Sequence, residues 1–194
     1  MILLSILLSC SQKHGGNRHA ELPPTSDIYQ VASQYIDMLY QSKEWQVFRL
    51  NLPPQGILAD HQTGPRIIVL LSDLKGQRLD DGTEFKAAMG DVFYLENSFS
   101  RGFKNQSEYK VSYLVFSLLS DSGVKTFVDS DCPSGLSRLK LPQSPVAVCL
   151  VEHSGMIELQ HQVFKYDLQH GKIEKIAKQQ VHKVEIGDWL FVLP

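Results

Sequence analysis

The sequence predicts a mainly β protein, built as a sandwich or barrel of short strands and preceded by one helix. Along most of the chain, apolar and β-branched residues come in short runs separated by Gly, Asp, Asn and Ser. Short strands at this spacing are typical of sandwiches and barrels. One pattern of turn and strand residues also occurs twice. With 194 residues, 43% of them hydrophobic, the chain is long enough to bury a core.

The first ten residues form an apolar block, Met1 to Leu8, followed by Ser9 and Cys10. The block is too short to cross a bilayer. It resembles a bacterial lipoprotein signal, with Leu7 to Cys10 as the lipobox and Cys10 as the lipidated residue after cleavage. The resemblance implies a lipid-anchored protein of the bacterial cell envelope that faces the periplasm, with the outer membrane favoured. The alternative is a buried N-terminal strand or helix with an incidental cysteine.

The residues that follow the block, 11–26, are polar and contain paired Gly and paired Pro. This composition predicts a flexible tether. A single helix is then expected between Asp27 and Trp45, because apolar residues recur there at three- and four-residue spacing. These residues are Ile28, Val31, Ala32, Tyr35, Ile36, Leu39 and Tyr40. Thr25, Ser26 and Asp27 offer side-chain oxygens for the helix N-cap. We expect this helix to pack across the sheet or barrel.

Nine β-rich runs predict the strands. They comprise residues 46–52, 66–72, 84–88, 91–95, 111–118, 146–151, 157–167, 174–182 and 189–193. The clearest stretch extends from Gly56 to Leu118 and includes the apolar run Arg66 to Leu71, with a turn expected at Gly76. Because alternate strand residues point inward, aromatic side chains of this stretch are expected in the barrel core. They are Phe93, Tyr94, Phe99, Phe103 and Phe116.

The charge distribution argues against a nucleic-acid partner. The 19 basic and 21 acidic side chains give a net charge of −2, and the basic residues are interspersed with acidic ones. A phosphate backbone is held by clustered Lys and Arg, and the chain has no such run. No stretch reaches the roughly 18 apolar residues of a membrane-spanning helix. Attachment to a membrane is therefore expected through the lipid at Cys10 only.

A turn-and-strand pattern occurs twice in the chain. Asp73 to Gly76 precedes Gly90-Asp91 and an apolar strand, and Asp167 to Gly171 precedes Gly187-Asp188 and another apolar strand. Gly supplies the positive φ that such turns require, and the Asp carboxylate can cap the turned backbone. The repetition suggests a duplicated unit. We therefore expect a first half at residues 27–125, made of the helix and a barrel, and a second half at 126–194.

The stretch from Gly56 to Leu118 resembles a cupin, a small jelly-roll barrel. Cupins carry a second motif of Gly, Pro, Gly, His and Asn, and Gly90 and Asn105 lie at its spacing. Inside the motif, Glu96 stands where Pro is usual, Ser98 where Gly is usual, and Arg101 where the metal-binding His is usual. The resemblance implies a cupin-type double-stranded β-helix for the first half.

The first cupin motif, of Gly, two His, Glu and Gly, is matched less well. His61 is its only imidazole, Thr63 replaces the second His, and the Glu position falls within the apolar segment Ile67 to Val69. Cupin enzymes hold their metal with imidazoles and a carboxylate. One imidazole, a hydroxyl and the permanently cationic Arg101 do not form such a ligand set. We therefore expect no metal and no cofactor.

The second half resembles a partial cupin. With Ile157 to Pro194 as a second copy, the whole chain resembles a bicupin. This copy ends at Pro194, before the segment that would carry its own second motif. Either its last strands are missing, or the two halves combine into fewer closed sheets.

A ligand pocket is expected where His61, Thr63 and Arg101 converge. The forked donors of Arg101 would bind a carboxylate or phosphate there; alternatively, Arg101 lies on a surface turn and pairs with Glu96 or solvent. The expected function is a metal-free, membrane-tethered module that binds a small ligand, for instance an anion, or a protein partner in the periplasm. The alternative is a cupin-type enzyme, either a metal-independent isomerase or epimerase that uses His61 or a metal enzyme with atypical ligands. The resemblance also implies a homodimer.

The number of cysteines is consistent with a location in the periplasm. If Cys10 is lipidated, Cys132 and Cys149 remain as an even pair, which would form a disulfide in an oxidising periplasm. Cys149 lies in the apolar run Val146 to Val151, where a buried free thiol is the alternative.

Overall fold

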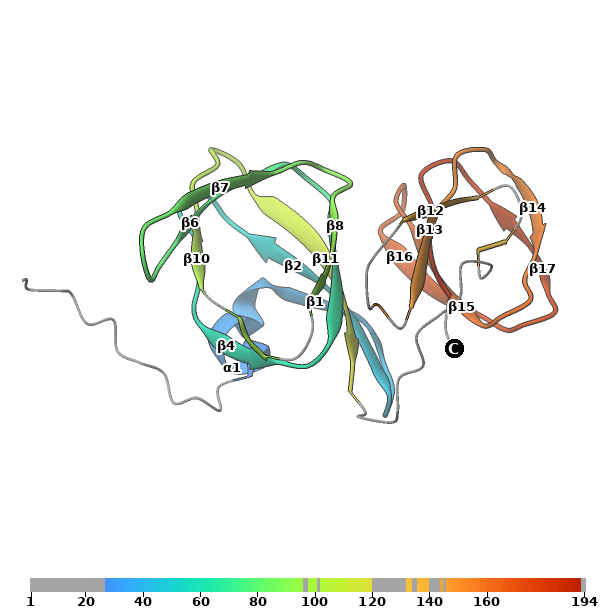
Figure 1. Cartoon of the computed structure of the whole chain (residues 1–194), viewed down its shortest axis with the longest axis horizontal. Coiled ribbons are helices and arrows are strands. Elements are labelled where there is room, and N and C mark those ends of the chain that lie inside the picture. The colour runs from blue at the N-terminus through green and yellow to red at the C-terminus, as the bar shows by residue number, and fades with distance from the viewer. Residues whose placement is uncertain are drawn as a thin grey trace, which may run out of the picture.

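The computed structural model describes residues 27–95, 98–100, 102–119, 132–133, 136–139, 144 and 146–192. The predicted signal and tether, with Cys10, lie outside these residues, and so do Glu96 and Arg101. The described chain is mainly β and forms two halves that lie side by side (Figure 1). No helix in this part of the chain is long and apolar enough to span a membrane.

The N-terminal helix is much shorter than predicted. Helix α1 covers Ile28–Ala32 and is followed by a 3₁₀ turn, Ser33–Tyr35. Asp27 is the N-cap, and its carboxylate accepts a hydrogen bond from the Tyr29 backbone nitrogen at 2.8 Å. The helix prediction is wrong from Ile36 onward, where strand β1, Ile36–Gln41, begins.

The reason for this change is the pairing of β1 with β2, Trp45–Leu52. The pairing satisfies the backbone of β1, and it is reinforced when Arg49 and Asn51 of β2 bind the Asp37 carboxylate at 3.0 and 2.8 Å. A shift of register between Met38 and Tyr40 interrupts the simple alternation of side chains. An apolar pattern interrupted in this way resembles helical spacing in the sequence.

The first half is a ribbon of strands folded back on itself. Five strands lead out: β2, β3 (Ile57–Leu58), β4 (His61–Thr63), β5 (Arg66–Leu70) and β6 (Leu74–Arg78). Five return: β7 (Glu84–Ala87), β8 (Val92–Leu95), β9 (Ser98–Ser100), β10 (Phe103–Asn105) and β11 (Val111–Leu118). The pairs β6–β7, β5–β8, β4–β9, β3–β10 and β2–β11 are all antiparallel.

Two further pairings, β11 with β5 and β10 with β6, close this ribbon into a barrel. The result is a five-stranded sheet, β1-β2-β11-β5-β8, facing a four-stranded sheet, β3-β10-β6-β7. This nested winding is a jelly roll. The predicted fold class, a double-stranded β-helix, is confirmed.

The second half has a similar winding with fewer strands. They are β12 (Ser137–Leu139), β13 (Ala147–Leu150), β14 (Gly155–Glu158), β15 (Val163–Asp167), β16 (Lys172–Ile176), β17 (Val181–Val184) and β18 (Trp189–Val192). Each of the predicted runs 157–167 and 174–182 is thus two strands. The sheet order β12-β13-β18-β15-β16 matches β1-β2-β11-β5-β8 position by position, and the pair β14-β17 matches β3-β10.

The comparison of the two halves locates the missing strands. After β15 the chain turns at Gly171 directly into β16, within a segment that is described without a gap, and no counterpart of the β6–β7 hairpin is present there. The second half therefore lacks an internal hairpin. Its last described strand, β18, lies at the centre of the sheet, as β11 does in the first half.

The repeated turn pattern is partly confirmed. Gly90 and Gly187 have φ values of +90° and +88°. At both turns the following Asp caps the backbone: Asp91 Oδ2 accepts from the Ala88 nitrogen, and Asp188 Oδ2 accepts from the Glu185 nitrogen. The turn predicted at Gly76 is wrong. Gly76 lies inside β6, where a Cβ atom would come within 2.3 Å of the Phe85 ring.

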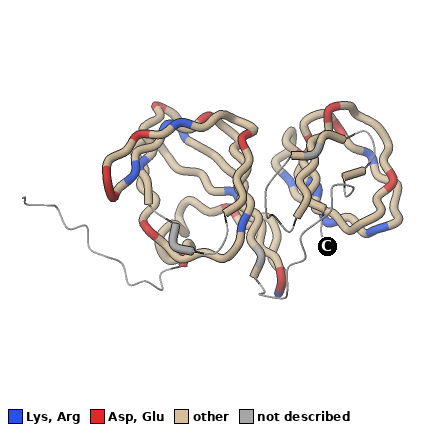
Figure 2. The backbone as a smooth tube through the Cα atoms, in the orientation of Figure 1, with Lys and Arg blue, Asp and Glu red and all other residues tan. Residues whose placement is uncertain are grey.

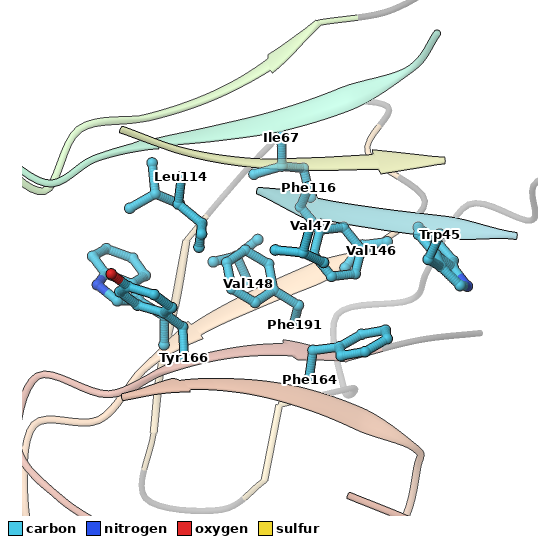
Figure 3. Packing of buried hydrophobic residues seen from close by; sticks show 12 residues of the cluster. Trp45, Val47, Ile67, Leu114, Phe116, Val146, Val148, Phe164, Tyr166 and Phe191 are labelled. Carbon is cyan, nitrogen blue, oxygen red and sulfur yellow. The ribbon is translucent and has the colours of Figure 1, made fainter. Parts of the chain in front are cut away.

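The buried side chains form three clusters. One fills the first barrel and one fills the second half. The third lies between the two five-stranded sheets, with Val47, Ile67 and Phe116 from the first half and Phe164 and Phe191 from the second (Figure 3). Alternation along each strand explains how one sheet serves two clusters.

The aromatic core prediction is correct in part. Phe116 is buried, but its ring belongs to the cluster between the sheets and not to the barrel interior. Tyr94 and Phe103 pack against clusters from partly buried positions. Phe93 is 41% exposed, so its prediction is wrong; the side chain of Phe99 lies outside the described part. Charged residues of both signs are distributed over both halves (Figure 2).

Candidate ligand-binding site

A row of polar side chains crosses the five-stranded sheet at one end of the first barrel. Ser117 on β11 is the direct partner of both Gln46 on β2 and Arg66 on β5. The next row on the same face, Phe48, Val115 and Ile68, belongs to the barrel core cluster. The polar row therefore lies where the apolar interior of the barrel ends.

All three polar residues line a pocket of about 290 Å³. The other lining residues come from the start of α1, from β2, from β4 and its following turn, and from the end of β11. They are Asp27, Ile28, Tyr29, Phe48, Gln62, Thr63, Gly64 and Leu119. The wall thus combines an apolar base with neutral polar groups, one cation and one carboxylate.

Arg66 is the buried charge of this pocket, with only 6% of its surface exposed. Its Nη1 donates to Thr63 Oγ1 and to the Gly64 carbonyl, the latter at 3.3 Å. Among the described residues, no carboxylate lies within ion-pair distance of the guanidinium. Burial lowers the pKa of Arg66 to about 10, opposed by nearby Tyr113, so the group stays charged at neutral pH. A buried charge without a counterion is costly.

Tyr29 and Gln46 form the opposite side of the pocket. The Tyr29 hydroxyl donates to Gln46 Oε1 at 3.2 Å, and its ring contacts Phe48 edge-on with 5.6 Å between ring centres. Burial, and to a lesser extent the charge of Asp27, raises the pKa of Tyr29 to about 12. The hydroxyl is therefore a permanent donor at neutral pH.

Of the predicted site residues in the described part of the chain, Thr63 lies at this pocket and His61 does not. Thr63 lines the pocket and contacts Arg66. His61 is 3% exposed, but it is not among the residues that line this pocket. Its Nδ1 lies 2.9 Å from the Ala59 carbonyl and donates to it, which leaves Nε2 unprotonated in the neutral ring. Burial lowers the pKa of His61, Arg66 lowers it further, and the bond to Ala59 opposes both. Arg101 lies outside the described residues.

Sequence reasoning missed Arg66, Gln46 and Tyr29. Arg66 begins an apolar run in which alternate residues face the barrel interior, and that position was the available signal. No such signal existed in the sequence for Gln46 and Tyr29, because a single polar residue at the end of a strand or in a helix is common.

Metal ligands do not cluster in the described part of the chain. No group of three or more His, Cys, Asp or Glu side chains lies close enough together there to hold a metal ion. The position predicted to replace a metal ligand, Arg101, is outside this part, so the expectation of a metal-free barrel stays a prediction.

Asn105, which ends the segment that resembles the second cupin motif, joins two loops and does not line the pocket. It is completely buried, and its Nδ2 is within 3.1 Å of the carbonyl oxygens of Leu52, Pro53 and Tyr109. Its Oδ1 accepts from the Ser107 nitrogen at 2.8 Å. These bonds connect the β2–β3 loop to the segment after β10, so this motif residue has a structural role.

Cys132 and Cys149 are joined as a disulfide. Cys149 lies on β13 and is completely buried, and Cys132 packs against the same core cluster. The bond ties the segment before β12 to the central part of the second half.

Solved structures with a similar fold include cupins, all of low sequence identity to this chain. A cupin domain from Bordetella pertussis Tohama I is 11% identical with a TM-score of 0.39, over 51% of this chain and 99% of that one. A cupin superfamily protein from Desulfitobacterium hafniense DCB-2 is 13% identical with a TM-score of 0.37, over 44% of this chain and 76% of that one. An RmlC-like cupin family protein with a double-stranded β-helix fold from Methanocaldococcus jannaschii is 12% identical. Its TM-score is also 0.37, and the match covers 43% of this chain and 77% of that one.

No family model matches the sequence, and no curated protein matches it either. At such identities and TM-scores, the likenesses carry no argument about a ligand, a reaction or a partner. The fold is the jelly roll, or double-stranded β-helix, and it is established by the strand pairing of the chain itself.

Proposed function

We propose that the protein is a binding module whose first barrel holds a small anionic ligand, a carboxylate or a phosphate, in the pocket beside Arg66. The observation that carries the proposal is the nearly complete burial of Arg66 with no carboxylate partner among the described residues. A ligand anion would supply a counterion to Arg66.

The donor geometry supports this use. Only Nη1 of Arg66 has hydrogen-bond partners in the described part of the chain, and both are neutral oxygens. The remaining N–H groups of a guanidinium form a fork that matches the two oxygens of a carboxylate or phosphate. Leaving a charged group buried and unpaired costs several kcal/mol. Binding an anion would recover part of that cost, so the ligand-free protein is less stable than the complex.

The test compares Arg66→Met with Arg78→Met. Met has nearly the length of Arg without its charge, and Arg78 is an exposed residue of β6, so both variants lose one positive charge. Thermal unfolding is measured with increasing acetate or phosphate at constant ionic strength. We expect stabilisation of the wild type and of Arg78→Met, and none of Arg66→Met.

Without ligand, Arg66→Met should be at least as stable as the wild type, because a buried charge with no carboxylate partner in the described part of the chain has been removed. Equal stabilisation of all three proteins by both anions, or no stabilisation of any of them, would contradict the proposal.

The alternative, an enzyme that uses His61, receives less support from the geometry. A general base must reach the substrate, and His61 is not among the residues that line the pocket. We propose that the barrel acts without a metal. Metal analysis of the purified protein tests this, because stoichiometric iron, manganese or zinc would contradict it.

We also propose that the protein is lipid-anchored at Cys10 in the cell envelope and faces the periplasm. The disulfide between Cys132 and Cys149 supports an oxidising compartment. Fatty-acid labelling should be present in the wild type and absent in Cys10→Ser; labelling of both would refute the anchor.

Two further parts of the proposal concern the two halves and assembly. The matching sheet orders of the halves support a bicupin that arose by duplication. A homodimer is proposed from the cupin resemblance. Sedimentation of the purified protein tests the dimer, and a monomer at micromolar concentration would exclude it.

A further inference from the structure

We propose that the ligand is a monoanion that carries a neutral oxygen acceptor, such as a keto or amide carbonyl, on the side away from its charge. This inference rests on the proposed anion site at Arg66 and specifies what the opposite wall recognises. Its basis is the way in which Tyr29 orients Gln46.

The Gln46 carboxamide has its oxygen engaged. The Tyr29 hydroxyl donates to Oε1 at 3.2 Å, and a phenol has only one hydrogen to give. The raised pKa of Tyr29 keeps that hydrogen in place at neutral pH. The Nε2 group has no partner among the described residues, so it is the part of Gln46 left for a ligand. An amide N–H₂ group donates and does not accept, so its partner must be an acceptor.

Gln46 and Arg66 are separated by the one intervening strand that carries Ser117. Neighbouring strands lie about 4.8 Å apart, which puts the two Cα atoms roughly 10 Å apart. A ligand of a few carbon atoms between the two side chains would meet Arg66 at one end and Gln46 at the other. The Ser117 hydroxyl between them can donate or accept a hydrogen bond, so it does not discriminate between ligands that carry a donor and ligands that carry an acceptor.

The charge at the Gln46 end favours a neutral acceptor over a second anion. Asp27 lines the same pocket and is close enough to Tyr29 to raise the pKa of its hydroxyl. A second carboxylate at this end would be repelled by Asp27. A carbonyl oxygen accepts from Nε2 without that repulsion.

Three acids with five-carbon chains test the inference: pentanoate, 4-oxopentanoate and pentanedioate. All are ionised at pH 7. Ligand-observed NMR titrations at constant ionic strength give their dissociation constants. We expect 4-oxopentanoate to bind the wild type about fivefold more tightly than pentanoate, the gain of one net hydrogen bond. Pentanedioate should bind more weakly than 4-oxopentanoate.

Variants distinguish the contribution of Gln46 and Tyr29 from that of Arg66. Tyr29→Phe keeps the ring against Phe48 but frees the Gln46 amide, and Gln46→Met removes it; in both, we expect the fivefold preference to fall to about one. Gln180→Met, an exposed position on the second half, is the control and should keep the preference. Thermal unfolding shows whether each variant is folded. If only one of the two pocket variants folds, that variant alone is enough to test the inference.

The outcomes are distinguishable. If the wild type binds pentanoate and 4-oxopentanoate equally, and Arg66→Met loses both, this inference is wrong and the anion site stands. A preference that survives in Tyr29→Phe and Gln46→Met also refutes the inference. If the wild type binds none of the acids, or binding does not depend on Arg66, the anion site for carboxylates is refuted and this inference with it.

Discussion

Replacing Phe116 with Ala is expected to weaken the whole molecule, because its ring lies at the centre of the cluster shared by the two halves. Phe116 is 1% exposed. Its ring is stacked on Phe191 with 4.9 Å between ring centres, and it contacts Phe164 at 5.2 Å and Trp45 at 5.0 Å. Phe→Ala substitutions in cores cost about 3–5 kcal/mol through lost burial and the remaining cavity. With three aromatic neighbours, we expect about 4 kcal/mol here.

Guanidinium unfolding followed by tryptophan fluorescence measures this loss. Trp45 and Trp189 both belong to the cluster, so the signal reports on the interface from both sheets. Phe93→Ala is the matched control, because Phe93 lies on the same five-stranded sheet but is 41% exposed; its cost should be about 1 kcal/mol or less. If Phe116→Ala costs no more than Phe93→Ala, the two sheets do not pack together in solution as they do in the structure.

Three further predictions concern single features of the fold. Asn105→Ala removes the side-chain donor of three carbonyls, one of them buried and two partly buried, and should cost about 3 kcal/mol in the free energy of unfolding. A cost below about 1 kcal/mol would contradict the loop-joining role. Reducing the Cys132–Cys149 disulfide, which closes a loop of sequence separation 17, should lower stability by about 3 kcal/mol in unfolding measured with and without dithiothreitol. An unchanged midpoint would argue against the bond in the purified protein. Gly187→Ala forces a side chain into a φ of +88° and should cost about 1 kcal/mol or more, whereas Gly155→Ala, with open space and no positive φ, should cost clearly less; equal melting temperatures would refute this reasoning.

The sequence predicts the long, apolar parts of the fold well and its short polar strands poorly. The runs that became β2, β5 and β11 carry apolar residues on both faces, because one face contributes to the barrel core and the other packs against the second half. By contrast, β3, β4 and β10 are two or three residues long and are defined by their partners and not by their own composition. Local patterns cannot identify such strands, since tertiary pairing determines them.

Sequence reasoning anticipated Thr63 at the candidate pocket but not the central residue of that pocket, Arg66. The cupin resemblance located the expected pocket at the mouth of the first barrel and included Thr63, which lines the pocket. It also favoured Arg101, in a motif position, over Arg66, in an apolar run. The structure gives Arg66 its importance through burial and cross-strand position. Neither property can be obtained from a motif, because both depend on which strands become neighbours.

The cluster between the sheets explains how the second half can lack a hairpin. In the first barrel, the five-stranded sheet faces a four-stranded sheet, whereas in the second half only β14 and β17 form the facing pair. A smaller enclosed core stabilises less, because less apolar surface is buried. The second half compensates on its other face: Phe164, Tyr166 and Phe191 are buried against the first barrel. The outer face of one sheet thus replaces burial that a full barrel would provide inside. The pocket beside Arg66 lies on the interior face of the first sheet, whose opposite face is fixed by this same cluster. The second half therefore packs behind the strands that carry Gln46, Ser117 and Arg66, and it contributes no residue to the lining of the pocket in the described part of the chain.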